Sequence, residues 1–191
     1  KGKTCVTEPV KSRDHTERIL KYFGAKIKVK GLKVCIFGKK NISGKNINVP
    51  GDISSAAFFM VAGLIVPNSK IILKNAGINP TRTGIIDILK QMGANIKIVN
   101  KRSINFEPVA DIIVKSSKLK GVKIRGKIIP RLIDEIPIIA VAASLAKGKT
   151  IFKEIGELRI KESDRIFTLC AELRKFGVKV RELKNGMVVY G

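Results

Sequence analysis

The chain has 191 residues, of which 45% are hydrophobic and 28% are charged, and its formal net charge is +23 at pH 7. Its apolar residues recur in periodic runs, which excludes a disordered or fibrous protein, and the 5% of aromatic residues predict an aliphatic core. The longest apolar run, around 136–146, is shorter than the roughly 20 residues that span a bilayer, so no membrane span is expected. The positive charge favours anionic partners, such as nucleic acid or phosphorylated metabolites.

The cysteines and the single histidine limit the possible metal and redox chemistry. Cys5, Cys35 and Cys170 are odd in number and contain no C-x-x-C pair, which indicates neither a disulfide framework nor a thiolate zinc site. We therefore expect a reducing, cytoplasmic environment. With His15 as the only histidine, most metal sites are also excluded, and we expect neither a metal nor a cofactor.

The first predicted elements are a strand from Thr4, an amphipathic helix that ends at Gly24, and an alternating strand after this glycine. A further strand is expected over 32–37. Because the chain starts with a strand and without an initiator methionine, we expect a piece of a longer protein in which the first unit is cut. Such a cut leaves an apolar face uncovered.

The second group of elements begins with an apolar helix over 53–64, for which Asp52 is a good N-cap residue. A short β-like run at 47–49 leads into this helix. The elements expected next are a turn at 67–69, a strand over 70–74, a helix that ends at Gly93, a strand to 98, and a strand over 111–114.

The third group has the same order. Asp134 precedes an apolar run over 135–146, which predicts a second buried helix, and a β-like run at 127–129 comes before it. As an N-cap, Asp134 would need no further function, and the residues alone leave both interpretations open. The elements expected next are a turn at 147–149, a strand over 150–154, a helix that ends at Gly177, a strand to 180, and a strand over 187–190.

This internal likeness predicts an α/β fold of repeated β-α-β-α-β-β units. The spacing of Gly24, Gly93 and Gly177 gives a repeat of roughly 70 to 85 residues. Two complete units are expected, over about 46–118 and 119–191.

Three equivalent loops precede the second helix of each unit, namely Ser12–Thr16 (SRDHT), Asn79–Thr83 (NPTRT) and Arg159–Arg165 (RIKESDR). Helix N-termini favour anions because their N–H groups are unpaired and the helix dipole is positive there. For the second loop, capping and solvated charge are a sufficient explanation. The loops are therefore candidate anion sites, of which the third carries the strongest signal.

The third loop places Arg159, Lys161 and Arg165 near a helix N-terminus, where cations are unfavourable unless an anion binds. Lys161 and Arg165 are four residues apart, which predicts a shared helix face. Glu162 is three residues from Arg165 and is expected to pair with it. The loop is therefore predicted to receive a negatively charged ligand.

Four motifs resemble one known family. GDISSA (51–56), LIDEIP (132–137), LRIKESDR (158–165) and EPVKSRDHT (8–16) are similar to 5-enolpyruvylshikimate-3-phosphate synthase, or 3-phosphoshikimate 1-carboxyvinyltransferase. The likeness covers essentially the whole chain in the family's order. Either of the K-E-S-D-R and S-R-D-H-T blocks would be a moderate signal alone, and the two together are specific.

The resemblance implies a two-lobe enolpyruvyl transferase fold, similar to an inverse α/β barrel, with a crossing between lobes near Val49-Pro50-Gly51. Residues 1–48 would end one lobe and 49–191 would form most of the other. The implied enzyme is a cytoplasmic transferase of the shikimate pathway, which leads through chorismate to the aromatic amino acids. It would move the enolpyruvyl group of phosphoenolpyruvate onto the 5-hydroxyl of shikimate 3-phosphate and release phosphate.

The family's functional residues are carried over onto five positions. Asp134 would bind the hydroxyls of shikimate 3-phosphate and take the proton of the attacking one. Glu162 would protonate the methylene carbon of phosphoenolpyruvate, and Arg165 would hold that substrate. Lys161 and Ser12 would contact shikimate 3-phosphate. Flanked by cations, Glu162 should be ionised when no substrate is bound, so bound anions and lobe closure would have to raise its pKa.

The chain also departs from the family pattern. Basic and polar residues expected from N-terminal and C-terminal parts are absent, and Glu157 stands where some members have an Asn that touches the shikimate. We therefore expect the isolated chain to bind ligands weakly and not to turn over. The intact protein is expected to be a monomer with no nucleic-acid or membrane partner.

Three alternatives remain open. The sister enolpyruvyl transferase acting on UDP-N-acetylglucosamine shares the fold, but the K-E-S-D-R and S-R-D-H-T blocks fit it less well. A basic nucleic-acid-binding module would bind with steep salt dependence, although base-stacking aromatic residues are scarce. The third alternative is a non-catalytic protein that has kept the fold.

Overall fold

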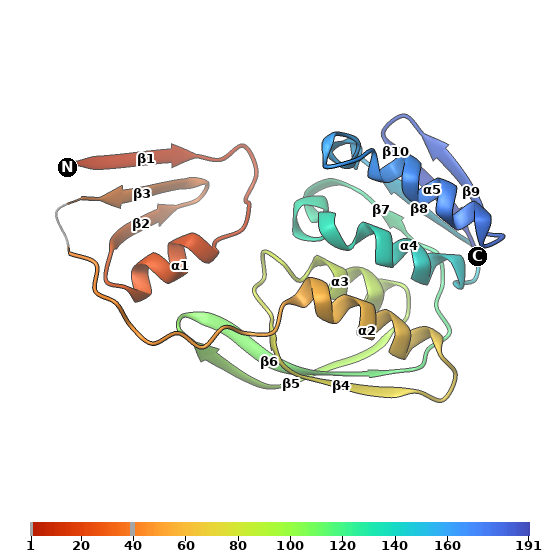
Figure 1. The fold of residues 1–191 in the computed structure, drawn as a ribbon, viewed down its shortest axis with the longest axis horizontal. Helices are drawn as coiled ribbons and strands as arrows, with labels where there is room; N and C mark the ends of the chain where they lie inside the picture. Colours follow the sequence, from red (N-terminus) through yellow and green to blue (C-terminus); the bar gives the residue numbers. More distant parts are fainter. Residues whose placement is uncertain (1, 39–40) are drawn as a thin grey trace.

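A computed structural model describes residues 2–38 and 41–191, which form three mainly antiparallel sheets with helices between and beside them (Figure 1). The N-terminal unit contains a three-stranded sheet of order β1-β3-β2 with one helix. Its elements are β1 (Lys3–Thr7), α1 (His15–Tyr22), β2 (Lys26–Lys30) and β3 (Lys33–Phe37).

The second unit has a sheet of order β4-β6-β5, in which the last strand of the unit again lies in the centre. One helix precedes the first strand of this sheet, and a second helix lies between its first and second strands in the chain. Its elements are α2 (Ile53–Ile65), β4 (Lys70–Gly77), α3 (Gly84–Gln91), β5 (Asn95–Ile104) and β6 (Glu107–Lys115).

The third unit repeats this arrangement in a sheet of order β7-β8-β10-β9, with β7 parallel to β8. Short 3-10 helices replace part of the loops. Its elements are β7 (Lys123–Ile124), η1 (Gly126–Arg131), η2 (Ile133–Glu135), α4 (Ile136–Ser144), β8 (Lys149–Lys153), η3 (Gly156–Ile160), α5 (Arg165–Lys175), β9 (Lys179–Leu183) and β10 (Gly186–Tyr190).

The glycine that ends the second helix of each unit has the backbone conformation that the repeat predicts. Gly24, Gly93 and Gly177 follow the C-caps of α1, α3 and α5 and have φ angles of 96°, 95° and 78°. This left-handed region is costly for residues with a Cβ atom, and glycine adopts it readily. The third unit confirms the β-α-β-α-β-β order in full, whereas the second unit has only an isolated bridge between Gly51 and Ala76 in place of its first strand.

The main core lies between the second and third units, where α2 packs against α4. These helices are apolar around most of their circumference and fall between the two larger sheets in Figure 1. Met60 and Leu64 of α2 and Ile139 and Ala143 of α4 are fully buried. The close helix contact follows from the small residues along both helices, and it fixes the loop before α4 relative to the start of α2.

The N-terminal unit contacts the rest of the chain through the tip of the long β5–β6 hairpin. Arg18 of α1 donates to the carbonyl oxygen of Phe106 at 2.9 Å, and the Phe106 ring meets Tyr22 edge-on with 5.7 Å between centroids. His15 Nδ1 lies 2.8 Å from a carboxylate oxygen of Glu107. The apolar side of this small sheet is only partly covered, and Val6 is 62% exposed.

Two predicted β-like runs are wrong. Residues 127–129 lie in the 3-10 helix η1, which contains Pro130, and the strand forms earlier at Lys123–Ile124. Residues 47–49 are irregular, and the pairing starts only at Gly51, whose N–H donates to the carbonyl of Asn75 at 2.8 Å. A proline cannot donate to a strand ladder, which explains why neither run continues as a strand.

The expectation of unpaired cysteines is also wrong for two of the three. Cys5 and Cys35 face each other across β1 and β3 and form a disulfide with Cα atoms 4.1 Å apart. Cys170 is a buried free thiol in α5. The pairing depends on strand register, which an odd cysteine count does not reveal.

Among the helices of the described residues, none is long and apolar enough to cross a bilayer.

Candidate active site

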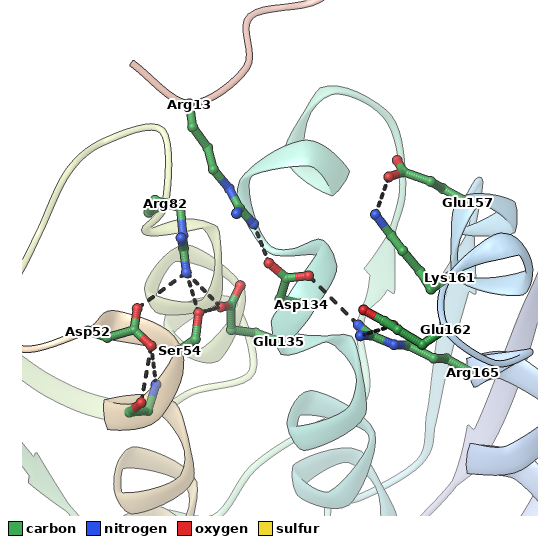
Figure 2. A network of polar contacts seen from close by, with 11 residues as sticks. Arg13, Asp52, Ser54, Arg82, Asp134, Glu135, Glu157, Lys161, Glu162 and Arg165 are labelled. Carbon is green, nitrogen blue, oxygen red and sulfur yellow. Dashed lines mark hydrogen bonds and ion pairs between the residues drawn. The ribbon is translucent and has the colours of Figure 1, made fainter. Parts of the chain in front are cut away.

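Two of the three equivalent loops meet at Asp134, which lies in the 3-10 turn η2 just before α4 (Figure 2). Arg13 of the first loop forms an ion pair with Asp134 Oδ2. From the third loop, Arg165 Nη1 lies 3.8 Å from Asp134 Oδ1. Residues far apart in the sequence thus bring two guanidinium groups to one carboxylate whose side chain is 33% exposed. The Asp134 carboxylate can accept hydrogen bonds from a polar ligand, and the two guanidinium groups can pair with the anionic groups of that ligand.

Of the two interpretations that the residues leave open for Asp134, that of a cap for the following helix is wrong. The N-cap position of α4 is Glu135, and Pro137 occupies the first turn. At the equivalent place in the second unit Asp52 does cap α2, because its carboxylate accepts from the N–H of Ser55 at 3.0 Å. The two aspartates therefore differ in their local role although they occupy similar positions in the repeat.

The cap at Asp52 yields a stability prediction. Burial raises the pKa of Asp52, but hydrogen bonds from the N–H groups of Ser55 and Ser54 outweigh it and hold the pKa below its ordinary value. Asp52→Ala should lower the free energy of unfolding by about 1 kcal/mol, whereas Asp52→Asn keeps a good cap and should lose less. Urea unfolding of the chain and both variants at pH 7 measures this, and equal stability of Asp52→Ala and the wild type would contradict it.

Glu162 and Arg165 form the predicted pair in the third loop, with 2.5 Å between Oε2 and Nη2. Glu162 is 78% exposed, and its pKa is lowered by a hydrogen bond with its own backbone N–H and by the Arg165 guanidinium. Without a ligand, Glu162 is therefore a carboxylate and holds no proton to donate. This agrees with the difficulty that the sequence raises for Glu162 as a proton donor.

Lys161 and Arg159 lie differently from the sequence prediction. Helix α5 begins at Arg165 with Asp164 as its N-cap, so Lys161 precedes the helix and shares no helix face with Arg165. Its Nζ instead binds Glu157 at 2.6 Å. Arg159 turns away to Asp164 and Glu182 at 2.7 and 2.9 Å, where it holds the loop against β9. Of the three cations, Arg165 alone pairs with Asp134 in the described parts of the chain.

Ser12 neither caps α1 nor reaches Asp134. Its hydroxyl donates to Glu8 at 2.5 Å, and α1 begins after Asp14. The adjacent Arg13 extends from this loop to Asp134, as Figure 2 shows. Arg13 had no role in the sequence prediction. The signal that could have pointed to it is its place before an N-cap in a loop equivalent to that of Arg165.

The second loop turns inward and forms a buried polar network. Asn79 is 1% exposed and accepts at Oδ1 from the N–H of Thr81 at 2.9 Å, so it holds the turn rather than capping α3. Arg82 reaches Ser54 and lies 3.4 Å from Asp52 and 3.8 Å from Glu135. The prediction of capping plus solvated charge is therefore wrong for Arg82, whose side chain is only 15% exposed.

A cavity of about 240 Å³ lies beside this network, where the first unit, residues 49–51 and the second unit meet. Its wall includes His15, Gly51, Asn79, Arg82 and Glu107. The His15 ring of the first unit thus shares one small cavity with Arg82 and Glu107 of the second unit.

The comparisons with known proteins agree on one family. The family model of EPSP synthase (3-phosphoshikimate 1-carboxyvinyltransferase) matches residues 1–191. A 3-phosphoshikimate 1-carboxyvinyltransferase from Petrotoga mobilis is 57% identical over 192 residues, covering 100% of this chain and 44% of that relative. The enzyme of the same name from Bacillus cytotoxicus is 56% identical over 190 residues, covering 100% of this chain and 45% of that relative.

The chain belongs to the EPSP synthase family. The family resemblance of the four motifs is confirmed. A solved EPSP synthase from Acinetobacter baumannii superposes with a TM-score of 0.95 at 45% identity, covering 100% of this chain and 43% of that structure. The enolpyruvyl transferase NikO from Streptomyces tendae shares the fold, with a TM-score of 0.73 at 17% identity and the same two coverages.

The mixed α/β enolpyruvyl transferase fold is thereby also confirmed. The chain spans about 44% of the length of the curated relatives it matches. The family's catalytic site is assigned below as a proposal, because more than half of the relatives' length lies outside the chain.

Proposed function

We propose that the intact gene product transfers the enolpyruvyl group of phosphoenolpyruvate to the 5-hydroxyl of shikimate 3-phosphate and releases phosphate. The observation that carries this proposal is Asp134, a partly exposed carboxylate that meets Arg13 and Arg165 from two different units. Both substrates carry several negative charges, which matches loops that present cations around a single acid. We also propose that residues 1–48 end one lobe, that 49–191 form most of the other, and that the enzyme is a cytoplasmic monomer.

In this site Asp134 binds the attacking hydroxyl of shikimate 3-phosphate and removes its proton. Without substrate, Arg13 occupies the same carboxylate, so the hydroxyl has to displace part of that ion pair. The displaced guanidinium then remains close to an anionic substrate. Ser12 and Lys161 contact shikimate 3-phosphate, and Lys161 exchanges its pair with Glu157 for the substrate.

Glu162 supplies the proton that the methylene carbon of phosphoenolpyruvate receives, while Arg165 binds that substrate. The carboxylate must first become protonated. Bound phosphate and carboxylate groups neutralise Arg165 and Lys161, and closure of the lobes removes water. Both changes raise the pKa of Glu162. In the addition intermediate the bond to phosphate then breaks, and the Glu162 carboxylate takes a proton back from the new methyl group, which forms the double bond of the enolpyruvyl product.

This pKa change is a testable prediction. In the substrate-free protein Glu162 should titrate below the ordinary value of about 4.3, and binding of shikimate 3-phosphate with inorganic phosphate should raise its pKa. Carboxyl ¹³C NMR of glutamate-labelled intact protein measures both titrations, with Glu162→Gln assigning the signal. A titration midpoint that stays below the ordinary value with both ligands bound would contradict the proton-donor role.

The function itself is tested by phosphate release from the intact gene product. We expect release with shikimate 3-phosphate and phosphoenolpyruvate, and none when UDP-N-acetylglucosamine replaces shikimate 3-phosphate. The isolated chain should release none with either acceptor. Absence of release from the intact product with shikimate 3-phosphate would reject the proposal and leave the fold assignment unchanged.

A further inference from the structure

Arg82 connects the start of α2 with the turn before α4. Its guanidinium lies 3.4 Å from Asp52, contacts the hydroxyl of Ser54, and lies 3.8 Å from Glu135 (Figure 2). The loop that carries Arg82 is fixed, since the backbone N–H of Arg82 donates to the carbonyl of Asn79 at 2.8 Å. Arg82 Nε is buried and has no hydrogen-bond partner among the residues that the structure describes. Keeping a guanidinium in this place is therefore costly and indicates a specific role.

The acid that Arg82 faces is buried and lies next to Asp134 in the chain. The Glu135 side chain is 2% exposed, accepts a hydrogen bond from the Ser54 hydroxyl, and points toward the start of α2. Asp134 points the other way, toward Arg13 and Arg165, as Figure 2 shows. Burial raises the pKa of Glu135, and the Ser54 hydrogen bond and the Arg82 charge oppose this. Arg82 is thus the counter-ion that favours a buried carboxylate here.

The turn that carries these two acids is short and packs on the core through Leu132 and Ile133, which are 0% and 6% exposed. Turn η2 comprises only Ile133–Glu135, and the Glu135 N–H donates to the carbonyl of Leu132 at 3.0 Å. Turns of this type have poorer hydrogen-bond geometry than an α-helix and are short. The Glu135 side chain ties the turn to α2 through Ser54, so the direction of Asp134 depends on where Glu135 is held.

We propose that Arg82 is a positioning residue for Asp134, which acts by holding Glu135 and Ser54 together at the N-terminus of α2. This inference rests on the proposed function, in which Asp134 is the base. Loss of the Arg82 charge leaves the Glu135 carboxylate buried without its paired cation. Glu135 then either takes up a proton or moves toward water, and in both cases the turn that carries Asp134 shifts. A misplacement of about 1 Å in a catalytic group costs about 100-fold in rate.

The test uses the intact gene product with Arg82→Gln, Arg82→Lys and Glu135→Gln. Arg82→Gln should lower kcat by about 100-fold while KM for both substrates stays within about threefold. Arg82→Lys keeps the charge and should recover most of kcat. In Glu135→Gln the glutamine side chain has the shape of the glutamate but no charge, so this variant should lower kcat less than Arg82→Gln. The matched control is Arg102→Gln, which should leave kcat unchanged. Arg102 is an exposed residue of β5 and contacts Asn75 and Asn100.

A structural measurement accompanies the kinetics. Hydrogen exchange of the amides over 132–136 should become faster in Arg82→Gln than in the wild type, and the amides of β8 should exchange at an unchanged rate. If Arg82→Gln fails to fold, Glu135→Gln and Arg82→Lys decide the question by the same kcat and exchange measurements. An active wild type with kcat of Arg82→Gln within twofold of it, or a rise in KM with unchanged kcat, would overturn the inference. An inactive wild type would instead reject the proposed function.

Discussion

Asp134→Asn should lower the rate of phosphate release by the intact gene product by about 10²- to 10⁴-fold, the usual contribution of a general base. The amide has the same size as the carboxylate but cannot accept the proton of the attacking hydroxyl. It also removes the negative charge that Arg13 and Arg165 face, so two cations from different units are left without their shared anion. Because Asp134 is also proposed to bind the substrate hydroxyls, KM for shikimate 3-phosphate should rise as well.

The control for this variant is Asp87→Asn. Asp87 is likewise paired with an arginine, at 2.9 Å from Arg131, but it lies on α3 outside the proposed site. Steady-state phosphate release at saturating substrates compares both variants with the wild type. A rate for Asp134→Asn within threefold of the wild type, with Asp87→Asn unchanged, would remove Asp134 from the role of base.

Glu162→Gln is the second change with a large expected effect. Without a group that can carry a proton at this place, protonation of the methylene carbon should slow by about 10²- to 10⁴-fold. The glutamine keeps an oxygen for Arg165, so binding of phosphoenolpyruvate should change much less than kcat. The limb of the pH–rate profile that reports Glu162 in the wild type should be missing in the variant.

Glu172→Gln is a closely matched control for Glu162→Gln. Both acids pair with a cation three residues later, Glu172 with Lys175 at 2.7 Å and Glu162 with Arg165 at 2.5 Å, and both are exposed. A pH–rate profile from pH 5 to 9 measures all three proteins, and Glu172→Gln should match the wild type. If Glu162→Gln kept both limbs at the full rate, the proton would have to come from another group.

Local sequence patterns were sufficient for the repeated elements. A helix that ends in Gly24, Gly93 or Gly177 followed by an alternating strand depends on residues a few positions apart, and the positive φ of these glycines confirms it. The motifs also identified the family, because K-E-S-D-R and S-R-D-H-T keep their residues at fixed spacings. Where the pattern was short and next to a proline, as at 127–129, the same local reasoning was wrong.

Neighbouring residues along the chain could not predict the Cys5–Cys35 pair or the position of Arg159. The disulfide requires that β1 and β3 align with Cys5 opposite Cys35, which strand register decides. Arg159 could have faced either Asp134 or β9. It faces β9 because Asp164 and Glu182 offer it two carboxylates there.

The sequence by itself determined the repeat, the family and the loops in which charged residues gather, since each depends on neighbours along the chain. The tertiary structure alone decided that Arg13 meets Asp134 and that Arg82 holds Glu135. Arg13 and Asp134 are 121 positions apart, and their contact depends on how one unit packs against another. Side-chain direction at the ends of short turns is set by such packing, so it could not be read from spacing along the chain.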